Sequence, residues 1–184
     1  MTARDTLLEG LRRDGLVIGE VTLASGRTAR YYVDARRALL RPAAFRAAGE
    51  LVAEKARELG AAAVGGPTLG ADPVACSVLA AADDLKAFIV RKERKEHGLQ
   101  RWIEGPEIAS GERVLVVEDV VTSGGSLISA IERVREEGVE IAGALAVLDR
   151  LAGGRDSIEQ ALGDGLPYVA LLTIDDVYPD RPDR

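Results

Sequence analysis

Two adjacent carboxylates, Glu118 and Asp119, directly follow the apolar run 114–117. Residues 122–126 then read Thr-Ser-Gly-Gly-Ser and lead into a helical pattern of apolar residues. Glycines let backbone N–H groups converge on an oxyanion, and the start of the following helix favours a phosphate. Carboxylates accept hydrogen bonds from vicinal hydroxyls and stabilise positive charge that develops on a sugar ring. The pattern predicts a sugar-phosphate site; the alternative is a plain strand-to-helix turn with Asp and Ser as caps.

A cationic stretch, Arg-Lys-Glu-Arg-Lys-Glu-His-Gly at 91–98, directly follows a second apolar run at 87–90. It holds two of the four lysines and the one histidine of the chain. Ammonium groups and an imidazole that titrates near neutral pH can neutralise a departing diphosphate. Since Glu93 and Glu96 balance part of this charge, the alternative is a solvated charged surface.

A third candidate is Arg150, in the Leu-Asp-Arg sequence that ends the apolar run 141–148. A guanidinium is suited to hydrogen bonding with a planar anion. The alternative is a surface or helix-capping arginine.

Segment 114–127 resembles the diphosphate-sugar signature of the type I phosphoribosyltransferases, and 91–98 resembles the catalytic loop of the orotate phosphoribosyltransferase family. With the hood-like segments 22–27 and 31–34, the resemblance covers about residues 5–175. It implies Mg²⁺-dependent transfer of ribose 5-phosphate from phosphoribosyl diphosphate (PRPP) to N1 of orotate. The products are orotidine 5′-monophosphate and diphosphate, in pyrimidine (UMP) biosynthesis.

The resemblance also implies a role for individual residues. Lys95, His97 and Asp119 are implied as catalytic. The implied PRPP-binding residues are Arg91, Lys92, Lys95, His97, Glu118, Asp119, Val120, Val121, Thr122, Ser123, Gly124, Gly125 and Ser126. The implied orotate-binding residues are Thr122, Arg150, Tyr32 and Val33. Mg²⁺ is expected on the diphosphate and ribose hydroxyls of the substrate, without a metal site made of protein side chains. A homodimer with shared active sites is implied, in which the loop closes over the neighbouring subunit's site.

Two positions depart from the family pattern. Many members have a lysine where this chain has Ala24, and a Tyr-Lys pair where it has Leu69 and Gly70. Fewer side chains are therefore available to contact the diphosphate. The backbone of 66–71 is still expected to approach PRPP, because its glycines permit close packing.

The chemistry-bearing segments must be positioned by a sheet, because short apolar runs alternate with helical segments along the chain. Such runs are typical of a parallel sheet that helices cover on both faces. We predict an α/β fold, with a central, mostly parallel sheet flanked by helices, in one domain over 1–184. The expected parts are a helix and β-hairpin hood (about 1–36), a mobile catalytic loop too polar for a sheet strand (about 91–112) and a flexible tail (176–184). The expected helices are 3–14, 41–60, 71–82 and 126–137, the hairpin is 17–34, and the strands are 61–65, 86–90, 113–117, 141–148 and 168–174.

Composition excludes several other classes. The net charge of −6 argues against a nucleic-acid partner, and a single histidine excludes zinc sites that need two. The sequence contains neither G-x-G-x-x-G nor G-x-x-x-x-G-K-[ST], the usual dinucleotide and P-loop motifs. Since no apolar run approaches the roughly 18 residues that span a bilayer and the N-terminus is charged, we expect a cytoplasmic protein without a membrane partner.

Cys76 lies in an apolar segment and is expected to be buried.

Two rival functions remain. A purine phosphoribosyltransferase would share 118–126 but has no evident need for Arg150 or for Lys92, Lys95 and His97. A PRPP-sensing transcriptional regulator keeps the fold without catalysis. Such a regulator is expected to carry a basic surface or a DNA-binding domain, and we expect this acidic chain to have no room for one. Trp102, inside the predicted loop, has two interpretations: a latch against the body of the protein, or a partly buried anchor.

Overall fold

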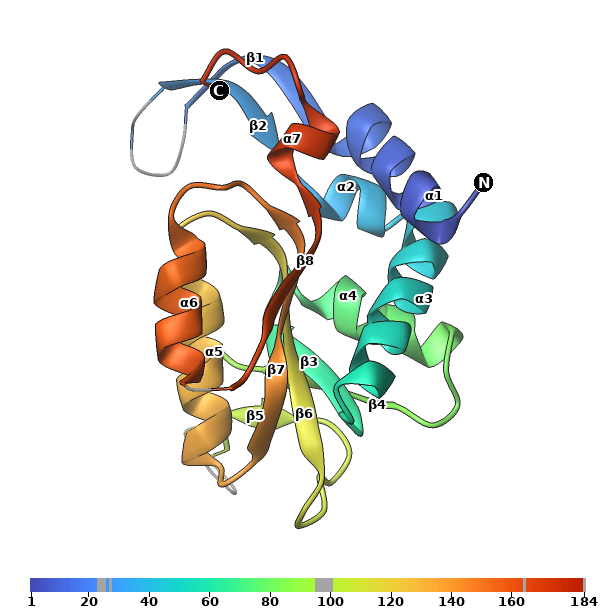
Figure 1. Ribbon diagram of the computed structural model, residues 1–184, viewed down its shortest axis with the longest axis vertical. Helices are drawn as coiled ribbons and strands as arrows, with labels where there is room; N and C mark the ends of the chain where they lie inside the picture. Colours follow the sequence, from blue (N-terminus) through green and yellow to red (C-terminus); the bar gives the residue numbers. More distant parts are fainter. Residues whose placement is uncertain (23–25, 27, 95–100, 164, 184) are drawn as a thin grey trace.

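Parallel strands form the centre of the molecule (Figure 1). The computed structural model describes residues 1–22, 26, 28–94, 101–163 and 165–183. Over these residues the strand order of the main sheet is β5-β4-β3-β6-β7-β8, and neighbours are parallel except for the antiparallel pair β4 and β5. The strands are β3 (Ala63–Pro67), β4 (Lys86–Val90), β5 (Ile103–Glu104), β6 (Arg113–Val121), β7 (Glu140–Asp149) and β8 (Tyr168–Thr173).

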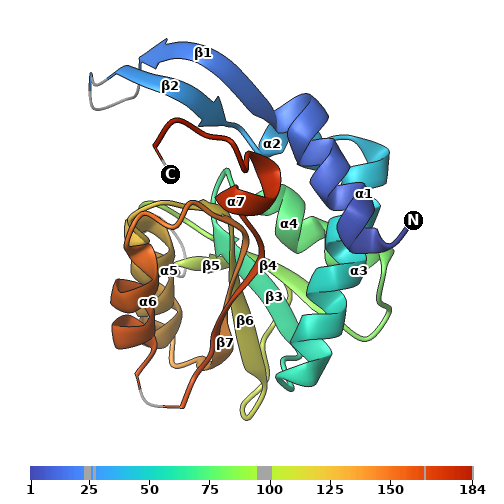
Figure 2. The same ribbon diagram turned by 45° about the horizontal axis from the view of Figure 1, so that its top comes forward.

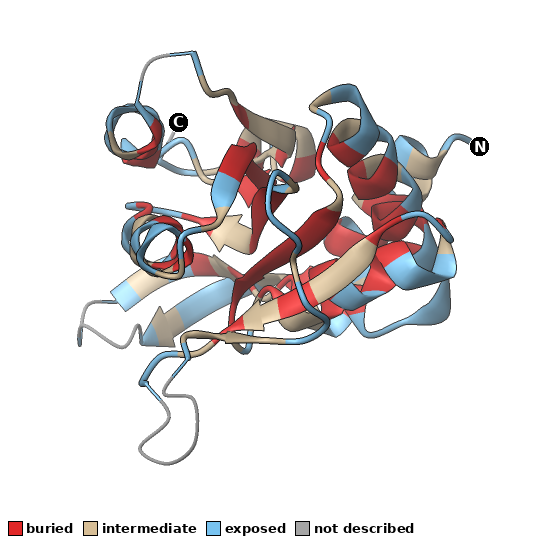
Figure 3. Ribbon diagram, turned by 90° about the horizontal axis from the view of Figure 1, so that it is seen from below, coloured by how far each residue is buried: buried red, intermediate tan, exposed pale blue. Residues whose placement is uncertain are grey.

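Helices cover both faces of this sheet (Figure 1). On one face lie α3 (Pro42–Glu58) and α4 (Asp72–Ser77), which continues as the 3-10 turn η2 (Val78–Ala80). On the other lie α5 (Gly125–Glu136) and α6 (Gly154–Leu162). Successive side chains of a strand point to opposite faces. On β6, Leu115 and Val117 accordingly join the apolar cluster under α3, and Val114 and Val116 join the one under α5. In Figure 3 the central strands are largely buried, and the helices beside them carry both buried and exposed residues.

A hood stands over the carboxyl ends of the parallel strands (Figure 2). It contains the hairpin, whose Tyr31 hydroxyl donates to Asp183 Oδ2 at 3.1 Å and whose Tyr31 ring meets the Tyr178 ring edge-on, with centroids 5.4 Å apart. The C-terminal segment therefore packs against the hood. The remaining elements are α1 (Ala3–Gly10), the π-helical turn η1 (Leu11–Gly15), the antiparallel pair β1 (Leu16–Thr22) and β2 (Thr28–Val33), α2 (Arg36–Leu39) and α7 (Ile174–Val177).

The α/β class, the hairpin and the expected strands and long helices are confirmed, with bounds that differ by a few residues. The short helices α2, α6 and α7 were not expected. The extents of the hood, the mobile loop and the flexible tail stay predictions. No helix within the described ranges is both long and apolar enough to cross a membrane.

Two expectations were wrong. Segment 91–112 was expected to contain no sheet strand, but Ile103 pairs with Val90 and Glu104 with Ile89 as the antiparallel strand β5. An edge strand can be this short and partly polar because one of its sides faces away from the sheet. Cys76 is exposed. Helical periodicity turns residues 74, 75 and 78 of its segment to the core and leaves 76 and 79 on the opposite side, so an apolar run does not bury every member.

Candidate active site

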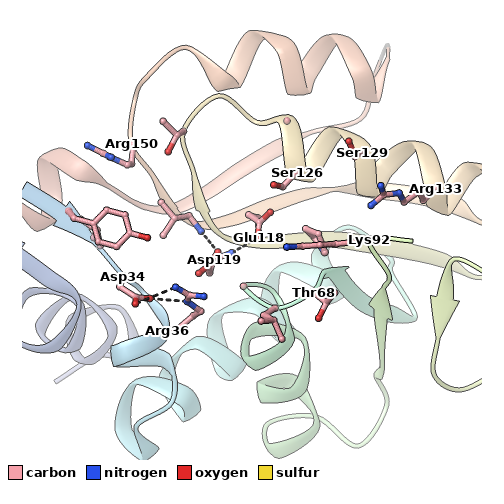
Figure 4. A pocket seen from close by; sticks show the side chains of 18 residues that line it. Asp34, Arg36, Thr68, Lys92, Glu118, Asp119, Ser126, Ser129, Arg133 and Arg150 are labelled. Atoms are coloured by element: carbon pink, nitrogen blue, oxygen red, sulfur yellow. Dashed lines mark hydrogen bonds and ion pairs between the residues drawn. The ribbon is translucent and has the colours of Figure 1, made fainter. Parts of the chain in front are cut away.

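A cavity of about 620 Å³ opens at the carboxyl ends of the strands, between the hood and the start of α5 (Figure 4). Ligands of open α/β sheets bind at this edge. We call it the main cavity. A smaller cavity of about 150 Å³ adjoins it, along residues 118 and 120–127.

The end of β6 places Glu118 and Asp119 on the wall of the main cavity. The Asp119 backbone N–H donates to Glu118 Oε1 at 3.3 Å, and the Val120 N–H donates to Asp119 Oδ1 at 2.8 Å. Burial, and next the charge of Asp119, raises the pKa of Glu118 to about 9, against a smaller opposing effect of Lys92. Burial also raises the pKa of Asp119, and the charge of Arg36 partly offsets this rise. The ligand-free pair therefore holds a proton at neutral pH and gains its second charge most readily when donors or cations enter the cavity.

The turn from β6 into α5 lines the smaller cavity with Val120, Val121, Thr122, Ser123, Gly124, Gly125 and Ser126. Gly124 caps the helix at a φ of +83°, a conformation that favours glycine. A Cβ on Gly124 would lie 2.8 Å from Ile158 Cγ1, so α6 packs closely behind this turn. Helix α5 begins at this turn and is 12 residues long. The positive end of its dipole points to this turn and suits a phosphate.

Two of the predicted diphosphate contacts lie beside neighbouring cavities. Lys92 lines both the main cavity (Figure 4) and an adjacent cavity of about 420 Å³, whereas Arg91 lines only the adjacent one. Arg91 Nη1 lies 3.2 Å from Glu104 Oε1. Lys95 and His97 lie outside the described residues, so their implied roles stay predictions.

The residues implied for the base meet at the hood side of the main cavity. Arg150, Thr122, Tyr32 and Val33 all line it. Arg150 Cζ stands 5.0 Å from the centroid of the Tyr31 ring. Among the described residues, the buried Nε of Arg150 has no hydrogen-bond partner. An arginine with unused donors beside an aromatic ring can bind a planar anion.

Asp149, the residue before Arg150, is 1% exposed, and its carboxylate accepts from the Tyr168 hydroxyl at 3.0 Å and from the Leu151 N–H at 2.8 Å. Burial and the charge of Asp149 raise the pKa of Tyr168. This buried pair fixes the end of β7, from which Arg150 extends.

Glycine brings the loop after β3 close to the carboxylates. A Cβ on Gly66 would lie 1.9 Å from the Val117 carbonyl oxygen, and one on Gly70 would lie 2.4 Å from Asp119 Oδ1. This loop has a cis peptide bond between Thr68 and Leu69. The absence of a side chain at Gly70 therefore makes room for the Asp119 carboxylate.

Sequence reasoning missed five polar side chains of the main cavity, one of which, Thr68, lies in the segment 66–71 whose backbone was expected near PRPP. On α5, Ser129 and Arg133 share a face with Ser126, and this spacing of three and seven residues is the signal that could have found them. The others are Asp34 and Arg36, whose Oδ1 and Nε atoms form an ion pair at 2.9 Å. Only the structure shows that the hood brings this pair to the cavity.

Comparison with known proteins assigns this architecture to a class. Residues 36–162 match the family described as "Phosphoribosyl transferase domain", and the fold is that of the type I phosphoribosyltransferases. The orotate phosphoribosyltransferase of Corynebacterium glutamicum is 47% identical over 176 residues, which cover 95% of this chain and 94% of that protein.

Two solved structures agree. Mycobacterium tuberculosis H37Rv orotate phosphoribosyltransferase in complex with Fe(III) dicitrate has a TM-score of 0.85 and 45% identity, covering 96% of this chain and 99% of that one. Its complex with PRPP has a TM-score of 0.80 and 40% identity, covering 95% and 98%. The chain belongs to the orotate phosphoribosyltransferases within this family.

Proposed function

We propose that this chain is an orotate phosphoribosyltransferase, which transfers ribose 5-phosphate from PRPP to N1 of orotate and releases diphosphate. The observation that carries the proposal is one cavity that joins the buried Glu118 and the half-buried Asp119 to the turn at the start of α5 and to Arg150. The related enzyme solved with PRPP, at 40% identity, supports the same substrate.

In this proposal PRPP lies along the carboxyl edge of the sheet. The 5′-phosphate binds at residues 122–126, where the helix start and the hydroxyls supply donors. The ribose hydroxyls donate to Glu118 and Asp119. The diphosphate lies toward Lys92, with Arg91, Lys95 and His97 as its further predicted contacts.

Orotate binds at the hood side, with its carboxylate and ring carbonyls toward Arg150 and Thr122 and its ring against Tyr32 and Val33. The deprotonated N1 then forms a bond to the anomeric carbon as the bond from that carbon to the diphosphate oxygen breaks. Positive charge that develops on the ribose is stabilised by Glu118 and Asp119, and the cations neutralise the leaving group. Arg150 supplies orientation, since it holds the planar base with N1 facing the ribose.

The donors of the main cavity also fit Mg²⁺, because Glu118 and Asp119 offer hard oxygen ligands and this ion keeps several waters. These carboxylates would hold it through ribose hydroxyls or waters. Mg²⁺ supplies charge neutralisation of the diphosphate when bound. We propose a cytoplasmic location as well, because the substrates are multiply charged and a bilayer excludes such groups.

The test of function follows the loss of orotate absorbance with PRPP and Mg²⁺, with adenine, hypoxanthine and uracil in parallel. Orotate alone is expected to be consumed. The Lys92→Ala and Lys95→Ala variants should lose at least tenfold in kcat/KM, while Lys55→Ala, a lysine on α3, should keep the rate. Consumption of a purine would favour the purine enzyme. PRPP binding without consumption of any base would favour the regulator.

We further propose a homodimer with shared sites, supported by the resemblance of 91–98 and by the prevalence of two-fold dimers. Light scattering measures the mass in solution, and a mixing experiment tests the sharing. If Lys95 acts in the partner's site, Lys95→Ala mixed with Arg150→Ala should regain activity, because each heterodimer then contains one intact site. No recovery after verified subunit exchange would contradict shared sites.

A further inference from the structure

Trp102, the one tryptophan of the chain, is fixed to the end of α5. Its backbone N–H donates to Glu137 Oε1 at 2.7 Å, and its ring Nε1 donates to Glu136 Oε2 at 2.7 Å. The ring is half-buried against the end of α5, a contact that both interpretations of Trp102 share.

Two guanidinium groups contact this ring. Arg133 Cζ lies 4.8 Å from the ring centroid, and Arg94 Cζ lies 5.4 Å from it. Arg133 Nη1 also donates to the backbone oxygen of Arg91 at 3.1 Å. A guanidinium over an aromatic face keeps its planar donors free for such bonds. Arg133 thus connects the Trp102 ring to the backbone at the end of β4.

The backbone of Arg91 is held from both sides. Its N–H donates to the Trp102 carbonyl oxygen at 2.9 Å, and its own carbonyl accepts from Arg133. One residue earlier, Val90 pairs with Ile103 of β5. Lys92 extends from this fixed backbone into the main cavity, which Arg133 also lines (Figure 4).

We propose that Trp102 and Arg133 are positioning residues for the diphosphate end of the main cavity. Trp102 orients the Arg133 guanidinium, and Arg133 fixes the backbone from which Lys92 reaches the ligand. This inference rests on the proposed function and extends it to residues outside both family-like motifs, 91–98 and 114–127.

The placement of Arg133 distinguishes this role from simple attachment of β5. Attachment requires the two glutamate bonds and the strand pairing, but no guanidinium on the cavity wall. Because Arg133 lines the cavity, an anion bound beside Lys92 attracts it. The contact between Arg133 and the Trp102 ring therefore changes when the diphosphate end is occupied.

The experiment uses the full chain and the emission of its single tryptophan. PRPP or inorganic diphosphate, each with Mg²⁺, is titrated while calorimetry records binding. Saturable change of the emission is expected in the natural sequence and should be lost in Arg133→Gln. In this variant KM for PRPP should rise about tenfold, the size expected from one cation–π contact and one charge-assisted hydrogen bond, while KM for orotate stays within about twofold.

Two further variants sharpen the result. Arg155→Gln removes a comparable contact, 4.8 Å from Arg155 Cζ to the Tyr168 ring centroid, away from the main cavity, and should leave both KM values unchanged. Arg133→Lys keeps the charge and should recover part of the PRPP affinity. Trp102→Leu should raise KM for PRPP as Arg133→Gln does; if it fails to fold, the Arg133 series and the emission still decide the matter.

The outcomes separate this inference from the proposed function. An Arg133→Gln variant that behaves like Arg155→Gln, or calorimetric binding without any emission change, overturns the positioning role even if orotate is consumed. An emission response that depends on Arg133, without consumption of orotate, supports the positioning role and refutes the orotate reaction. Absence of PRPP and diphosphate binding refutes both.

Discussion

Replacement of Glu118 by glutamine is expected to stabilise the ligand-free protein at neutral pH. Glu118 is 6% exposed, and burial next to Asp119 raises the pKa of its carboxyl from 4.5 to about 9. A group whose pKa is raised by folding contributes its stability fully below the unfolded pKa and loses it as the pH rises through the folded pKa. The natural protein should therefore lose stability between pH 4.5 and 9. The glutamine variant has no charge to form at this position and should not.

The magnitude follows from this window. Each unit of pKa difference corresponds to about 1.4 kcal/mol of unfolding free energy. Between pH 4.5 and 7 the variant should accordingly gain up to about 3 kcal/mol over the natural protein, and more by pH 9. Part of this gain in stability comes from the removal of the repulsion between Glu118 and Asp119, because the charge of Asp119 contributes to the raised pKa of Glu118.

Urea unfolding of both proteins without ligand, at pH 4.5, 7 and 9, measures the difference. The control is Glu132→Gln, on the exposed face of α5, whose effect should be small and alike at the three pH values. An effect of Glu118→Gln that is equal at pH 4.5 and 9, or that turns destabilising as the pH rises, would refute the reasoning. In the same variant kcat should fall, because a neutral amide cannot balance positive charge on the ribose.

Three further changes test other parts of the structure. Gly66→Ala should cost more than about 3 kcal/mol of unfolding free energy, because the new Cβ would overlap a β6 carbonyl oxygen at 1.9 Å; thermal melting against the natural protein measures this, and an unchanged Tm would contradict it. Tyr168→Phe should cost about 1–3 kcal/mol in urea unfolding at pH 7, because Asp149 loses a buried donor; a loss below about 0.5 kcal/mol would argue against this bond. Tyr31→Leu should raise KM for orotate about fivefold and leave KM for PRPP unchanged, because the ring beside Arg150 is removed; equal changes in both constants would show a general disturbance of the cavity instead.

The sequence predicted the centre of the site better than its margins. Glu118, Asp119 and residues 122–126 follow an apolar strand directly, so local order alone places them at the carboxyl edge. Arg150 was found in the same way, at the end of β7. Each of these signals lies within one strand and the turn that follows it.

The remaining features depend on contacts between distant segments. Arg36 reaches the cavity because the hood folds over the sheet, and neither its type nor its neighbours indicate this. Strand β5 forms because two residues pair with the free edge of β4. Two residues are too few to show the alternation that identifies a strand in a sequence. Cys76 shows the converse: an apolar run predicted burial, but a short helix has one face to bury. Burial of the carboxylate pair, and with it the raised pKa of Glu118, also requires the packed fold.

Strand β5 has a consequence for association between molecules. A sheet edge with unpaired backbone groups can recruit a strand from another chain, which begins aggregation. Along β4 that edge is covered in sections: β5 pairs with Ile89 and Val90, and Gly105 packs so closely that a Cβ there would lie 3.0 Å from the Ala87 carbonyl oxygen. Lys86 closes the start of the edge through Glu112 Oε2 at 2.7 Å. Because Trp102 holds β5 in place, the attachment of Trp102 to α5 also shields this edge of the sheet. Loss of that attachment would make the protein prone to aggregate and would weaken PRPP binding.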